Sequence, residues 1–213
     1  MASRENGQTR ARRLTADSAQ IEIKYGEVMK ALLIVDVQKD FCPGGALAVE
    51  DGDKVMPVIN SLMKNFQIII ASRDEHPEAS RHFDKWPKHC VKDTTGAEFH
   101  DLLDTSQIQQ VFLKGTGTRD DGYSAFEATN VNLEGYLKER TVDEIYITGL
   151  ATDYCVKQTS VDAAQKGFAT FVVTDAVKGV NAQEGDDERA LEEMRRNGVK
   201  LVSSQDIGRQ DGA

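Results

Sequence analysis

The sequence predicts an α/β domain of three layers: an open, mainly parallel sheet of six strands with helices on both faces. Short β-branched runs alternate with segments of helical period from Lys30 onward, which indicates strands linked by helical crossovers. The first run, "ALLIVDV", is apolar almost throughout, as a strand buried on both faces should be. Unusual polar residues stand at the strand ends, where an open parallel sheet binds its ligands.

The elements follow one another in a regular order. We expect strands at Ala31–Val37, Gln67–Asp74, Gln110–Gly115, Asp143–Leu150, Ala169–Val177 and Val199–Ser204. Helices are expected at Asp53–Phe66, which carries one apolar stripe, from about Cys155 to Gly167, and at Asp186–Gly198. The irregular stretch from Glu75 to Gln107 holds the only tryptophan and all four histidines. Loops of that length inside a domain are usually functional.

Composition limits the class of protein. A formal net charge of −9 over 213 residues argues against a nucleic-acid or anionic-membrane surface. The three cysteines form no C-x-x-C pair, so a reducing cytoplasm is the expected location. Residues 1–28 are polar and are expected to form a flexible extension, followed by a single domain over residues 29–213.

The stretch "TGLATDYCVKQ" places Cys155 at the start of a helix, just after the fourth strand. The helix dipole favours a thiolate there, and free N–H groups of the first turn could stabilise an oxyanion. Asp36 and Lys114, at the ends of the first and third strands, are candidates for the base and its orienting group. The alternative for Cys155 is a small buried residue beside Tyr154. The alternative for Asp36 and Lys114 is a salt bridge at the sheet edge. Asp175 is expected to be a turn or supporting residue.

The histidines predict a metal site. Asp74 and His76 are two residues apart, so an extended backbone directs both to one face. Aspartate and histidine suit zinc, iron or manganese, and three protein ligands would leave positions open. The alternative is a set of hydrogen-bonded surface histidines, and His100 is expected to lie outside the site.

Aromatic residues near the strand ends could stack on a planar ring. They are Phe41, Trp86, Tyr123 and Phe126. Ordinary loop packing is the alternative for all of them and the expected role of Phe126.

Five blocks in this order together resemble the nicotinamidase (pyrazinamidase) family of isochorismatase-like cysteine hydrolases: "IVDVQKDFCPGGALAV", "SRDEHP", "WPKHCVKDTTGAEFH", "KG…YSAFE" and "TGLATDYCVKQTSVDA". The resemblance runs from about Ala31 to Ser204. It implies Asp36, Lys114 and Cys155 as the catalytic residues, and Asp74, His76 and His89 as metal ligands, with His82 added in some members. It also implies a cis peptide at Leu150–Ala151 that turns the Ala151 and Cys155 N–H groups toward the oxyanion, and a ring slot of Phe41, Trp86 and Tyr123. The charged "TRDDG" segment and the N-terminal extension depart from the family pattern.

The activity that this resemblance implies is hydrolysis of nicotinamide, and of pyrazinamide-like amides, through a Cys155 thioester in NAD salvage. The resemblance also implies one divalent metal per chain and a small-molecule substrate. We expect no nucleic-acid or membrane partner. The oligomeric state stays open. The alternatives are a metal-free relative that hydrolyses an N-carbamoyl, ureido or isochorismate-like substrate, and a non-catalytic metal-binding or interaction module on the same fold.

Overall fold

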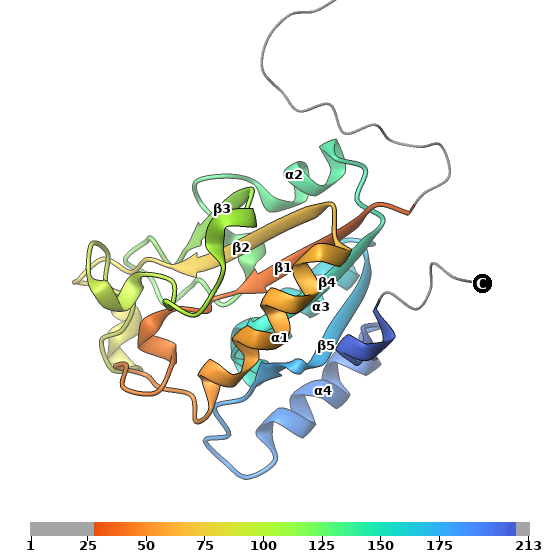
Figure 1. Ribbon diagram of the computed structural model, residues 1–213. Coiled ribbons are helices and arrows are strands. Elements are labelled where there is room, and N and C mark those ends of the chain that lie inside the picture. Colours follow the sequence, from red (N-terminus) through yellow and green to blue (C-terminus); the bar gives the residue numbers. More distant parts are fainter. Residues whose placement is uncertain (1–27, 208–213) are drawn as a thin grey trace, which may run out of the picture.

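The computed structural model describes residues 28–207. The expected N-terminal extension, residues 1–28, lies outside the described residues except for its last residue. The last six residues of the expected domain, 208–213, also lie outside them. The described chain forms a six-stranded sheet in the order β3-β2-β1-β4-β5-β6 (Figure 1). Its strands are β1 Lys30–Val35, β2 Ile68–Asp74, β3 Gln110–Lys114, β4 Glu144–Leu150, β5 Ala169–Lys178 and β6 Lys200–Val202. Every neighbouring pair is parallel, which confirms the predicted fold class.

Helices cover both faces of the sheet. Apolar residues of α1 (Val55–Leu62) pack on one face, against side chains of β1, β2 and β5. Residues of α2 (Leu133–Glu139), α3 (Lys157–Gln165) and α4 (Asp186–Arg196) belong to the core on the other face. Helix α2 was not predicted from the sequence, because it has only seven residues, one of them a glycine. Its start is fixed by the Asn132 side chain, which accepts a hydrogen bond from the Gly135 N–H.

The strand order reverses between β1 and β4, and this is where open α/β sheets bind ligands. Asp36 follows β1 directly, and Cys155 lies in the π-helical turn Thr152–Val156 that follows β4. Asp74 and Lys114 are the last residues of β2 and β3, and they pair across the sheet. The topology therefore brings the carboxyl ends of four strands, with their polar side chains, to one edge.

Close contact between β1 and β4 depends on Gly149. Its φ of +106° is in the left-handed region, and a Cβ atom there would lie 2.0 Å from the Val35 carbonyl oxygen. The glycine thus lets the two central strands approach each other beside the site.

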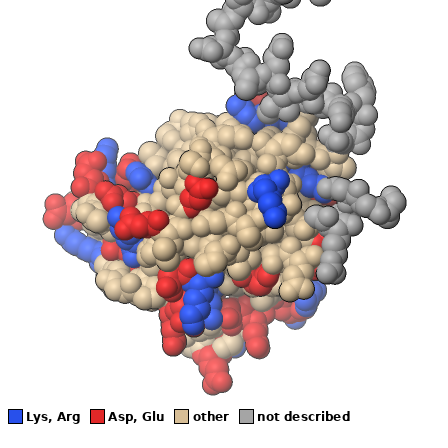
Figure 2. All heavy atoms as spheres, viewed as in Figure 1, with Lys and Arg blue, Asp and Glu red and all other residues tan. Residues whose placement is uncertain are grey.

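The described surface carries charges of both signs. Figure 2 shows acidic and basic side chains interspersed on the viewed face, with no continuous basic patch among the residues described there. Within residues 28–207, no helix is long and apolar enough to cross a membrane.

Candidate active site

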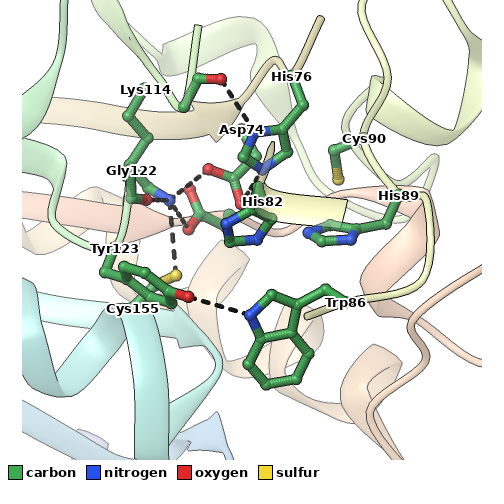
Figure 3. Close-up of polar contacts among 12 residues, drawn as sticks. Asp74, His76, His82, Trp86, His89, Cys90, Lys114, Gly122, Tyr123 and Cys155 are labelled. Atoms are coloured by element: carbon green, nitrogen blue, oxygen red, sulfur yellow. Dashed lines mark hydrogen bonds and ion pairs between the residues drawn. The ribbon is translucent and has the colours of Figure 1, made fainter. Parts of the chain in front are cut away.

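Lys114 is the centre of the polar site. Its Nζ lies 2.7 Å from Asp36 Oδ2 and 2.6 Å from Asp74 Oδ1, and it donates to the Gly122 carbonyl at 2.6 Å and to Cys155 Sγ at 3.5 Å (Figure 3). The Lys114 and Asp36 side chains have no exposed surface. The two carboxylates hold the pKa of Lys114 well above its usual value, against the opposing effect of burial. The lysine is therefore a permanent cation at the centre of the group.

Asp36 is placed for proton transfer. Its φ of +49° turns the chain off β1, a conformation that aspartate tolerates better than most residues. Ser72 on β2 donates a hydrogen bond to Oδ1 at 2.8 Å. Burial raises the pKa of Asp36, although Lys114 opposes the increase. A carboxylate with a raised pKa exchanges protons more readily near neutral pH, as a general base requires.

Cys155 rests as a thiol. Its Sγ and the nearest carboxylate oxygens of Asp36 and Asp74 all lie within 4.8 Å of one another. Burial raises the pKa of Cys155 well above its usual value, with Lys114 acting in the opposite direction. The position at the start of a helix favours the thiolate but does not by itself produce it. A nearby proton acceptor is needed, and Asp36 is within reach.

The peptide bond between Leu150 and Ala151 is cis, as the family resemblance implied. Ala151 then begins the turn that carries Cys155, and its carbonyl accepts from the N–H groups of Tyr154 and Val156, each at 3.1 Å. The role of the Ala151 and Cys155 N–H groups as an oxyanion hole stays a prediction.

Three buried histidines form the second half of the site. Ligand nitrogens of His76, His82 and His89 lie within 4.8 Å of one another. His76 Nδ1 is 2.9 Å from the Gly115 carbonyl, His82 Nδ1 is 2.9 Å from Asp120 Oδ1, and His89 Nδ1 is 2.7 Å from the Pro87 carbonyl. Each partner is an acceptor, so each Nδ1 carries the proton and each Nε2 keeps a free lone pair. The described residues offer no hydrogen-bond partner to the buried His76 Nε2.

This arrangement fits a divalent metal. Metal-binding histidines typically donate their other ring N–H to a carbonyl or carboxylate, as all three do here. Burial lowers the pKa of His89, and burial with the neighbouring His76 and His89 lowers that of His82 to about 4. Both rings are therefore neutral at pH 7, the form that binds a metal.

Asp74 joins the two halves of the site. Its Oδ1 contacts Lys114, and its Oδ2 lies 3.7 Å from His76 Nε2. Burial opposes ionisation of Asp74, but the Lys114 ammonium holds its pKa below the usual value. With Asp36 and Asp74 ionised, Lys114 balances only one of two buried negative charges. The remaining negative charge favours a cation beside the histidines.

A pocket opens between the two halves. Its walls include three predicted aromatics, Phe41, Trp86 and Tyr123, together with Cys155 and two of the histidines. Trp86 Nε1 donates to Tyr123 Oη at 3.0 Å, which fixes two of these rings relative to each other (Figure 3). Tyr154 also lines the pocket, with its ring 5.0 Å from that of Trp86. Sequence reasoning noted Tyr154 only as a neighbour of Cys155.

Some candidate residues lie elsewhere. Asp175 is exposed on β5, where it accepts a hydrogen bond from the Ser204 N–H at 2.8 Å, so it belongs to the β5–β6 end and not to the site. His100 is outside the histidine cluster, and its Nδ1 accepts from the Leu102 N–H. Phe126 packs against Phe168 at 6.3 Å, as expected for loop packing.

Sequence reasoning missed Gln38 as a part of the site. Its fully buried side chain donates to the carbonyls of Asp74 and Ala97 and accepts from the Asp74 N–H, each at 2.8 Å. It therefore fixes the backbone that carries Asp74. The only signal was its place in the "DVQKDF" block.

Comparison with known proteins identifies the family. The isochorismatase domain matches residues 30–206. The nicotinamidase/pyrazinamidase of Mycobacterium tuberculosis is 43% identical over 189 residues, which cover 83% of this chain and 100% of that protein. This chain belongs to the nicotinamidase family. A pyrazinamidase from Pyrococcus horikoshii, solved in complex with zinc, is 42% identical with a TM-score of 0.74, over 82% of this chain and 98% of the other. A protein from L. infantum, solved in complex with nicotinate, is 32% identical with a TM-score of 0.79, over 84% of this chain and 94% of the other.

Proposed function

We propose that this chain is a metal-dependent cysteine amidohydrolase that converts nicotinamide to nicotinate and ammonia. The observation that carries the proposal is that Cys155, with Asp36 and Lys114 behind it, opens into the same aromatic pocket as the histidine cluster. A small planar ring in that pocket would have its carboxamide at the thiol and its ring nitrogen at the histidines. Relatives named nicotinamidase, and the nicotinate bound to the L. infantum protein, support this choice of substrate.

Acylation starts with transfer of the Cys155 proton to Asp36. The thiolate forms beside the Lys114 ammonium, 3.5 Å from the sulfur, which stabilises its charge. Sulfur then attacks the carboxamide carbon, and the Ala151 and Cys155 N–H groups hold the resulting oxyanion. When the C–N bond breaks, Asp36 returns the proton to nitrogen, and ammonia leaves a nicotinoyl thioester on Cys155.

Deacylation reuses the same groups. Asp36 removes a proton from a water molecule, whose oxygen attacks the thioester carbon. The C–S bond breaks, the thiolate regains a proton, and nicotinate leaves. Lys114 keeps Asp36 oriented throughout, because its Nζ also binds Asp74 and the Gly122 carbonyl.

Asp74, His76, His82 and His89 would hold the divalent metal, and the chemistry of these donors suits zinc, iron or manganese. When bound, the metal supplies a coordination position for the pyridine nitrogen and so orients the ring. The zinc in the Pyrococcus horikoshii relative supports this assignment.

The wider role that we propose is NAD salvage in the cytoplasm, with nicotinamide as the small-molecule partner and pyrazinamide-like amides as further substrates. The three histidines disfavour the metal-free alternative, an N-carbamoyl or ureido hydrolase, because such a reaction needs no cluster of free Nε2 atoms.

Ammonia release from nicotinamide tests the proposal. Purified protein is assayed as isolated, after a chelator, and after zinc, iron or manganese is added back. We expect the chelator to abolish turnover and at least one metal to restore it. Absence of turnover in every metal state, with turnover of an N-carbamoyl compound, would replace the proposal with the alternative.

A further inference from the structure

Asp120 connects the metal side of the site to its aromatic wall. It lies in the loop between β3 and the turn Ala125–Glu127, within the "TRDDG" segment that departs from the family pattern. Its Oδ1 accepts two hydrogen bonds, from His82 Nδ1 at 2.9 Å and from Tyr123 Oη at 3.0 Å. Its Oδ2 is paired with Lys85 at the surface. The carboxylate is mostly buried, with 22% of the side chain exposed.

The contact with His82 differs from those of the other two rings. Backbone carbonyls of Gly115 and Pro87 hold His76 and His89, whereas a side chain holds His82. The position of His76 is also fixed by a β-bridge to Val91, while His82 lies in the short 3-10 turn Arg81–Asp84. The orientation of His82 Nε2 toward the cluster therefore depends on Asp120.

The contact with Tyr123 sets the direction of a hydrogen-bond chain. A phenol has one O–H group, and the Asp120 carboxylate can only accept. Tyr123 therefore donates its one hydrogen bond to Asp120. The oxygen lone pairs of Tyr123 then remain to accept from Trp86 Nε1, as observed at 3.0 Å. Both rings line the pocket. Asp120 thus fixes the Tyr123 ring directly and the Trp86 ring through Tyr123.

We propose that Asp120 is a positioning residue that orients His82 for the metal and the Tyr123–Trp86 pair for the ring of the substrate. The metal half of this inference depends on geometry alone, and the substrate half rests on the proposed function. Asp120 does not touch the reacting atoms, so it acts on metal affinity and KM more than on the chemical step.

Zinc affinity tests the first half. Competition with a chromophoric chelator is measured for the wild type, Asp120→Ala, Asp120→Asn and the control Asp84→Ala. Asp84 lies in the same region but is exposed and pairs with Arg81 at the surface. We expect Asp120→Ala to weaken zinc binding about 10- to 100-fold, as loss of a carboxylate behind a metal-binding histidine usually does. Asp120→Asn keeps an oxygen acceptor, so its loss should be smaller, and Asp84→Ala should match the wild type. Zinc affinity of Asp120→Ala equal to that of the wild type would overturn the inference.

A double-mutant cycle tests the second half with every variant saturated in metal. Asp120→Asn and Tyr123→Phe are combined, because both retain the shape of the side chain and should fold even if Asp120→Ala does not. We expect each to raise the KM for nicotinamide with a smaller change in kcat, and we expect the combined effect to be less than the product of the two. Multiplicative effects would show that Asp120 and Tyr123 act separately. If the wild type itself releases no ammonia, the proposed function fails, while the zinc measurement still decides the role of Asp120.

Discussion

Asp36 Oδ2 and Lys114 Nζ lie 2.7 Å apart, and neither side chain has any exposed surface. Asp74 completes the group from the other side of Lys114, at 2.6 Å. Charges buried in this way are tolerable only while they remain paired, because each has lost its hydration. The same contacts that support the proposed chemistry therefore also contribute to folding.

Replacement of Lys114 by methionine should destabilise the protein strongly. Lys114→Met leaves two adjacent buried carboxylates without a cation, and we expect the free energy of unfolding to fall by about 3–5 kcal/mol. Chemical denaturation of the metal-free wild type and variant measures this change in the free energy of unfolding. The control is Lys39→Met, which removes surface ion pairs to Glu98 and Asp101 and should change stability little. Equally small losses in both variants would contradict the assignment of Lys114 as a buried charge centre.

Asp36→Asn should remove catalysis while leaving the site assembled. The amide keeps an acceptor for the Ser72 hydroxyl but cannot take the thiol proton. We expect kcat to fall by about 100- to 10,000-fold, the usual contribution of a general base. Zinc affinity should change much less than kcat. Asp175→Asn, an exposed carboxylate on β5, serves as the matched control and should keep full activity. Near wild-type kcat in Asp36→Asn would require a different base.

Gln38→Leu should weaken both folding and metal binding. The substitution is close in size, but it leaves the buried backbone groups of Asp74 and Ala97 without their side-chain partners. We expect a loss of at least about 2 kcal/mol in stability and weaker zinc binding, because Asp74 loses its backbone support. Gln109→Leu removes one exposed hydrogen bond to the Gln67 carbonyl and is the control. A Gln38→Leu protein as stable as Gln109→Leu would refute this role.

The three cysteines should differ in reactivity. Cys155 lines the pocket, whereas Cys42 and Cys90 have no exposed surface. Burial raises the pKa of all three thiols, that of Cys42 to about 11, so access to the pocket and not the pKa distinguishes Cys155. We expect iodoacetamide at pH 8 to modify Cys155 first and nicotinate to slow the reaction, as peptide mass mapping would show. Modification of Cys42 at the rate of Cys155 would contradict the structure.

The sequence was informative where regular structure positions the residues. Parallel strands end at one edge, so Asp36, Asp74, Lys114 and Cys155 could be placed together from their positions at strand ends. Asp175 follows the same pattern but is exposed and turned to Ser204, because it lies between Val172 and Val177, where the register between β4 and β5 is irregular.

The periodicity of strands and helices could not predict the contacts made by loop residues. Asp120 meets His82 across 38 positions of chain, and Gln38 meets Asp74 across 36. Both pairs involve irregular segments, which have no periodicity from which a side-chain direction could be predicted. The seven-residue helix α2 was missed for a related reason, since it is too short to show a clear apolar stripe.

The central claim is that Cys155 is the nucleophile for an amide held in this pocket. The most direct measurement compares nicotinamide hydrolysis by the wild type and Cys155→Ala at equal metal content, with circular dichroism to verify folding. We predict turnover by the wild type and a loss of at least about 10,000-fold in Cys155→Ala, since no other thiol opens into the pocket among the residues described. A folded, metal-loaded Cys155→Ala protein that hydrolyses nicotinamide at the wild-type rate would contradict the account.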